Sequence, residues 1–176
     1  MSGLIAPHID LHRGGICFAH SYSELAKESK ADTYIILGIA HTPTVKTYVL
    51  TEKDFHTPLG TIPLNKEITD YLKKNCLNNF YTDEYTHKNE HSVEFQVLFL
   101  KYIYPEKEIT MVPILCSSMH ENIMKKTSPY EDKQVKEFID ALKTIVREYR
   151  EKLCVIAGVD FSHIGRRFGQ NITITP

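Results

Sequence analysis

The sequence lacks long hydrophobic runs, and no apolar stretch approaches the ~18 residues that a membrane-spanning helix needs. Residues 1–8 also lack the basic start and the apolar core of a secretory signal peptide. These two absences predict a cytoplasmic protein without a membrane partner.

The chain has no excess of charge of either sign. Its 21 lysines and arginines stand against 22 aspartates and glutamates, for a formal net charge of −1. Nucleic-acid-binding domains usually carry a strongly basic face, so no nucleic-acid partner is expected. The four cysteines are widely spaced and form no CxxC pair, which argues against a zinc ribbon and against a disulfide framework.

What is present fits a single globular domain of the α/β class. The 176 residues can bury a substantial core, and no internal repeat or linker divides residues 1–176. Apolar runs at 3–7, 33–39 and 153–159 alternate with segments of helical periodicity. This order predicts a central, mostly parallel sheet flanked by helices.

Further elements follow from the same patterns. Helices are predicted at 16–29, 66–74, 91–102 and 131–150, and additional strands at 45–50, 61–63 and 109–115. Gly14-Gly15 is expected in a loop before the first helix, which should bury Ile16, Ala19, Tyr22 and Ala26. Residues 78–90 are polar and irregular, and form a loop long enough to be functional.

The candidate site lies where three strands end. His8 and His41 each follow an apolar strand, and a third strand ends in Asp160-Phe-Ser162-His163. Ligands of open α/β sheets bind at the carboxyl ends of the strands, so these side chains should meet at one edge. Because imidazole is the commonest metal ligand, His8 and His41 are predicted to bind metal.

Other polar residues are assigned supporting roles. In an extended stretch His8, Asp10 and His12 would point the same way, so Asp10 and His12 are candidates for contacting substrate. His91 and Glu94 would share a helix face, His91 as an acid–base group and Glu94 as a substrate contact. Alternatively, His12 is a solvated loop residue and Glu94 only favours the helix N-terminus.

The third strand end adds oxygen and nitrogen donors. Asp160 and His163 are predicted to be catalytic, and Asp160 could instead orient a ligating histidine. Ser162 is a poor metal ligand at neutral pH. A mixed nitrogen and oxygen site of this kind suits iron, copper or zinc better than magnesium.

The combination of these blocks resembles the Memo-like family, whose bacterial and archaeal members are called AmmeMemoRadiSam system protein B. The matching segments are Ala6-Pro-His8, Ile36-Leu-Gly38 with His41, Thr57-Pro-Leu-Gly60, Glu90-His-Ser-Val-Glu94 and Asp160-Phe-Ser-His163. The resemblance implies a fold like that of the class III extradiol dioxygenases. It also implies partners of the AMMECR and radical-SAM types, and a chain shortened at both ends relative to the family.

The same resemblance implies that His8 and His41 are two of the metal ligands. In the animal proteins the third ligand is a cysteine, and Ser162 stands at the matching position here. Ser162 could then be the third ligand, or His163, Asp160, His91 or water could replace it.

Three functions follow as alternatives. The first is a metal-dependent redox protein, such as a dioxygenase-like oxidoreductase, in which His8 and His41 hold iron or copper. The second is a metallohydrolase whose ion lowers the pKa of a bound water, although the sequence contains no HExxH motif. The third is a non-catalytic module in which the histidine pocket receives a small molecule, a peptide or a partner loop.

Overall fold

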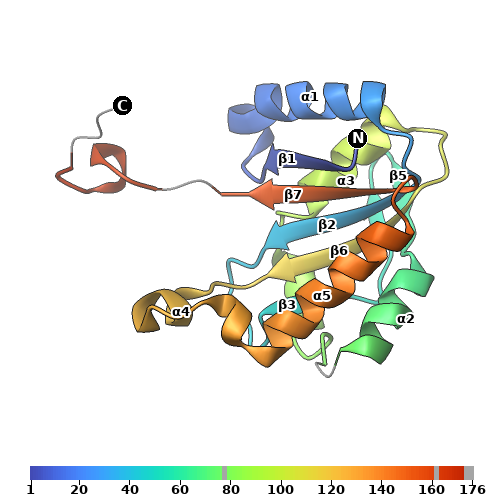
Figure 1. The fold of residues 1–176 in the computed structure, drawn as a ribbon. Coiled ribbons are helices and arrows are strands. Elements are labelled where there is room, and N and C mark those ends of the chain that lie inside the picture. The colour runs from blue at the N-terminus through green and yellow to red at the C-terminus, as the bar shows by residue number, and fades with distance from the viewer. Residues whose placement is uncertain (77–78, 161–162, 173–176) are drawn as a thin grey trace.

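A five-stranded sheet forms the centre of the computed structural model, which describes residues 1–76, 79–160 and 163–172 (Figure 1). The strand order is β1 (Gly3–Pro7), β7 (Leu153–Val159), β2 (Thr33–Ile39), β6 (Thr110–Cys116) and β3 (Tyr48–Leu50). The first four strands are parallel, and β3 pairs antiparallel with β6. The predicted α/β class with a mostly parallel sheet is therefore confirmed.

The central strand β2 pairs with β7 on one side and with β6 on the other. Its residues Tyr34, Ile35 and Ile36 are all buried, because helices cover both faces of the sheet at this point. A continuous apolar run is typical of a parallel strand covered in this way, so the prediction for residues 33–39 is confirmed.

Helices cover the two faces in pairs. The helices α1 (Leu11–Glu28) and α3 (Glu94–Ile103) pack on one face, and α2 (Lys66–Asn75) and α5 (Lys133–Glu148) pack on the other. Smaller elements are the hairpin β4 (Phe55–Thr57) and β5 (Gly60–Ile62), the helix α4 (His120–Lys125), and the short 3-10 helices η1 (Glu84–Asn89), η2 (Pro129–Glu131) and η3 (Arg166–Phe168). None of the helices among the described residues is long and apolar enough to cross a membrane.

The first helix corrects the sequence-based prediction. It begins at Leu11, so Gly14 and Gly15 are helical and do not form a loop. Its buried stripe consists of Gly14, Phe18, Tyr22 and Leu25, and Ile16, which was expected inside, is 77% exposed. A Cβ atom at position 14 would lie 2.5 Å from Cγ2 of Ile9, so any larger residue there would require the Ile9 side chain to shift.

This earlier start has a consequence for the site. His12 lies in the first turn of α1, and Asp10 is the N-cap residue of that helix. The expectation that His8, Asp10 and His12 point the same way along an extended stretch is therefore wrong, because the chain turns into a helix directly after Asp10.

Candidate metal centre

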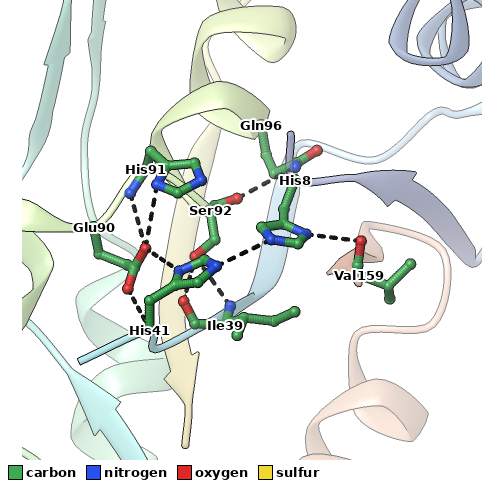
Figure 2. A network of polar contacts seen from close by, with 8 residues as sticks. All are labelled: His8, Ile39, His41, Glu90, His91, Ser92, Gln96 and Val159. Carbon is green, nitrogen blue, oxygen red and sulfur yellow. Dashed lines mark hydrogen bonds and ion pairs between the residues drawn. The ribbon is translucent and has the colours of Figure 1, made fainter. Parts of the chain in front are cut away.

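Three histidines from three segments meet at the carboxyl edge of the sheet (Figure 2). His8 directly follows β1, His41 follows β2 by two residues, and His91 precedes α3. Each offers a ring nitrogen, and these atoms all lie within 4.8 Å of one another. The predicted meeting of His8 and His41 at one sheet edge is what the fold produces.

His8 is held by the neighbouring strand. Its Nδ1 lies 2.9 Å from the carbonyl oxygen of Val159, at the end of β7. Since a carbonyl oxygen can only accept, Nδ1 carries a proton, and the neutral tautomer with this proton has its lone pair on Nε2. The parallel register pairs Pro7 with Val159, so the strand pairing itself sets this contact.

His41 is held by a carboxylate. Its Nδ1 donates to Oε1 of Glu90 at 2.7 Å, and its backbone N–H donates to Oε2 of Glu90, also at 2.7 Å. Because a carboxylate can only accept, Nδ1 of His41 carries a proton, and the neutral tautomer with this proton has its lone pair on Nε2.

The two Nε2 atoms lie 3.1 Å apart. Two lone pairs at this distance repel each other unless a proton or a cation lies between them. Nitrogen donors that share one ion at bonds of about 2.0–2.1 Å lie about 2.8–3.4 Å apart when the angle between the bonds is between 90° and the tetrahedral value. The pair His8 and His41 therefore fits two adjacent ligands of one transition-metal ion.

Glu90 is the buried anion of the site, with a side chain only 4% exposed. Burial by itself raises the pKa of Glu90. The hydrogen bonds from the backbone and ring of His41 and from the backbone of His91 lower the pKa by more than burial raises it, so the pKa of Glu90 lies below its ordinary value. Glu90 is therefore ionised at neutral pH, and its charge would offset that of a bound cation.

His91 is held more loosely than the other two rings. Its Nδ1 lies 3.5 Å from Oε1 of Glu90, and its ring stacks against His41 with centroids 4.9 Å apart. Two ligands of one ion at such bond lengths lie at most about 4.2 Å apart, so the widest separation in the cluster must shorten when an ion binds. His91 is the ring with the fewest restraints against that adjustment.

Two buried polar side chains at the start of α3 position the strand ends. The Ser92 hydroxyl donates to the carbonyl of Ile39 at 2.8 Å and accepts the backbone N–H of Ile39 at 3.0 Å. The Gln96 amide donates to the carbonyl of Pro7 at 2.8 Å. These bonds fasten the residues just before His41 and His8 to one helix.

Sequence reasoning assigned no role to Ser92 or Gln96. Both are fully buried, and the available signal was a polar residue in a helix that is otherwise apolar on almost every side. A buried amide or hydroxyl costs free energy unless it is hydrogen-bonded, so such residues point to a specific contact.

The remaining candidates lie outside the cluster. Asp10, His12 and Glu94 are exposed, with Glu94 at the first position of α3. His163 pairs instead with Asp160, at 3.3 Å between Nε2 and Oδ1, and residues 163–172 lie beyond the strand ends and apart from the sheet (Figure 1). Ser162 lies outside the described residues.

The end of β7 thus joins the site through a backbone atom. The predicted contribution was a side chain, and the described contact is the Val159 carbonyl on His8. The third member of the cluster is His91, which had been predicted as an acid–base group and also named among the alternatives for the third ligand.

The fold and the histidine cluster define an α/β protein with a candidate metal centre at the carboxyl edge of a parallel sheet. A family model described as Memo-like protein matches residues 1–175. The chain belongs to the Memo-like family, as the sequence motifs predicted.

Relatives described as MEMO1 family proteins agree with this assignment. The Aquifex aeolicus protein is 32% identical over 175 residues, which are 99% of this chain and 42% of the relative. The Methanopyrus kandleri protein is 32% identical over 93% of this chain and 53% of the relative. The Sulfurisphaera tokodaii protein is 34% identical over 90% of this chain and 52% of the relative. The chain spans about half the length of these relatives.

Proposed function

We propose that His8, His41 and His91 bind one transition-metal ion, iron or copper, and that the chain is a metal-dependent redox protein. The observation that carries this proposal is the 3.1 Å separation of the two Nε2 atoms, with both Nδ1–H groups donated to fixed acceptors. A metal-binding histidine almost always donates its other ring N–H to a carboxylate, a carbonyl or water. His8 and His41 each have such an acceptor without any ion to impose it.

The donor set favours particular metals. Neutral imidazole suits zinc, copper, iron and nickel, whereas magnesium and calcium prefer oxygen ligands. Three imidazoles leave coordination positions open, and bound iron or copper would supply one-electron chemistry there. Glu90 would balance part of the charge and keep His41 in the ligating tautomer.

Access to the site is one-sided. His8 is buried at 8% exposure, whereas the side chains of His41 and His91 are 45% and 42% exposed. A substrate or an electron-transfer partner would therefore approach across His41 and His91, while the sheet closes the other side.

Metal analysis tests the proposal. The purified chain is loaded anaerobically with Fe(II), and separately with Cu(II) or Zn(II), then desalted and analysed for bound metal. We expect one ion per chain, with large losses in His8→Ala and His41→Ala and none in His20→Ala, a control on the exposed side of α1. An equal amount of bound metal in the native chain and in all three variants would contradict the proposed metal site.

The redox role needs a separate readout. Iron-loaded protein is followed by electron paramagnetic resonance through a cycle of oxidation and reduction. A signal that appears and disappears with the cycle is expected. If the bound iron does not change oxidation state during the cycle, the proposed redox role is wrong, whereas the proposed metal binding still stands.

Hydrolysis is the second candidate, because three histidines with one open position are also the ligand set of catalytic zinc in carbonic anhydrase. Selective retention of zinc, together with ester or phosphoester turnover that a chelator abolishes, would favour it over redox chemistry.

A further inference from the structure

Tyr22 is a fully buried tyrosine on the inner stripe of α1, and its hydroxyl is bonded to Gln96 of α3. Its ring stacks on Phe99 of the same helix, with centroids 5.1 Å apart. The hydroxyl donates to Oε1 of Gln96 at 2.8 Å and lies 3.3 Å from the backbone carbonyl oxygen of that residue. A hydroxyl in an apolar core costs free energy unless it is bonded, so this contact is what distinguishes Tyr22 from a phenylalanine.

The side-chain amide of Gln96 has a hydrogen-bond partner on each of its ends. Its Nε2 donates to the carbonyl oxygen of Pro7 at 2.8 Å and to that of Ser92 at 3.2 Å, while its Oε1 accepts the Tyr22 hydroxyl. An amide turned over would set its own oxygen against two carbonyl oxygens, none of which can donate. The three partners together therefore fix a single orientation, in which the N–H2 group faces Pro7.

The Gln96 amide lies against both strands that place His8. Pro7 is the last residue of β1, and His8 follows it directly. On β7, a Cβ atom at Gly158 would lie 2.9 Å from Nε2 of Gln96, so the amide packs closely on this glycine. The next residue of β7, Val159, supplies the carbonyl oxygen that holds Nδ1 of His8. A displaced amide would therefore disturb His8 through its own strand and through the neighbouring one.

We infer that Tyr22 is a positioning residue of the histidine cluster, which acts through the Gln96 amide on the backbone beside His8. Without the hydroxyl, Oε1 of Gln96 is left in the core without its donor, which is unfavourable. The amide also loses the contact that fixes its orientation, so its bond to Pro7 is less well defined and His8 is held less firmly. The consequence for metal binding rests on the proposed function, whereas the consequence for the His8 ring does not.

Tyr22→Phe is the test variant, and Tyr34→Phe is its matched control. Tyr34 is also fully buried and belongs to the same core cluster as Tyr22. Its hydroxyl donates to the carbonyl oxygen of Ala31 at 3.1 Å, just before β2 begins and at the opposite end of the sheet from the histidines. Each substitution removes one buried hydroxyl, so both should lower the free energy of unfolding. Only Tyr22→Phe should change the histidine cluster.

The first readout is the imidazole of His8 in EDTA-treated protein, observed by NMR of the ring nitrogens and assigned by its absence in His8→Ala. The native ring should show the tautomer with its proton on Nδ1. In Tyr22→Phe the His8 signals should shift or broaden, whereas in Tyr34→Phe they should keep their native positions. Native His8 signals in Tyr22→Phe, or an equal change in both variants, would overturn the positioning role whether or not the chain binds metal.

The second readout is the affinity for Fe(II), measured by competition with a chromophoric chelator. Tyr22→Phe should lower it about two- to tenfold, the effect of one hydrogen bond, and Tyr34→Phe should leave it unchanged. An unchanged affinity in Tyr22→Phe would contradict the inference for metal binding. A native chain that binds no metal would instead contradict the proposed function, and the His8 signals would then decide the role of Tyr22.

A double-mutant cycle tests the path through Gln96. Gln96→Met removes the amide and keeps the length of the side chain, and Tyr22→Phe should have no further effect in that background, because residues that act through one contact are not additive. Both the His8 signals and the Fe(II) affinity are compared. An effect of Tyr22→Phe that is equally large with and without the Gln96 amide would show that Tyr22 does not act through it.

Discussion

Glu90 accepts both the ring N–H and the backbone N–H of His41, each at 2.7 Å, across 49 positions of sequence. One buried carboxylate thereby fixes the rotamer, the tautomer and the backbone of a candidate metal ligand at once. Val159 does the same for the tautomer of His8 with a single carbonyl. The histidine cluster is organised by these two acceptors as much as by the histidines themselves.

The choice between His91 and His163 as the third ligand can be tested directly. His91→Ala should weaken metal binding at least about tenfold, since even groups that only orient a ligand contribute about 10- to 100-fold. His163→Ala should bind as the native chain does, because its ring pairs with Asp160 away from the cluster. Competition with a chromophoric chelator gives both affinities, and the opposite order would return His163 to the site.

Replacing the buried carboxylate should weaken metal binding through His41. In Glu90→Gln the negative charge is lost, and the amide N–H2 group faces one of the two N–H groups of His41 that the carboxylate accepts. His41 is then held less firmly, so the affinity for Fe(II) should fall by about 10- to 100-fold. Glu94→Gln is the matched control, since Glu94 is exposed and lies outside the cluster. Titration calorimetry measures the Fe(II) affinity of both variants. Equal losses would mean that Glu90 acts only through its negative charge and not through its hydrogen bonds to His41.

The acid sensitivity of the fold should depend on Glu90. Its folded pKa lies below the ordinary value of 4.5, so its contribution to stability is present above that pH and is lost as pH falls through the folded pKa. As pH falls below about 4.5, the free energy of unfolding should therefore drop more steeply in the native chain than in Glu90→Gln. Urea titrations on metal-free protein measure it, and parallel curves would contradict the assignment.

Two glycines should respond oppositely to the same substitution. In Gly38→Ala the new Cβ would meet Oγ of Ser92 at 2.6 Å and Cγ2 of Val93 at 2.7 Å, which should destabilise the fold by about 1–3 kcal/mol. Gly15→Ala meets nothing within 4 Å inside α1 and should stabilise it by about 0.5–1 kcal/mol. Urea titrations measure the free energy of unfolding of both variants, which should fall in Gly38→Ala and rise in Gly15→Ala.

Gly38→Ala should also disturb the metal centre, since the displaced Ser92 is the residue that fastens Ile39, two positions before His41. A loss of stability without any change in metal affinity would show that the hydrogen bonds between Ser92 and Ile39 do not support the metal site.

Much of the fold was readable because parallel strands leave simple local patterns. The apolar runs at 33–39 and 153–159 match β2 and β7, and the amphipathic pattern at 131–150 matches α5. The start of α1 was missed because Gly14 and Gly15 are poor helix formers, and tertiary packing against Ile9 overrides that preference.

By itself, the sequence determined that His8 and His41 would share one edge of the sheet, since each follows a strand and parallel strands end together. Only the tertiary structure decided which groups complete the cluster. Ser92 and Gln96 dock the start of α3 onto the ends of β2 and β1, and this docking carries Glu90 and His91 to the histidines. Periodicity encodes elements locally, but contacts between a loop and a distant strand depend on packing that no local pattern contains.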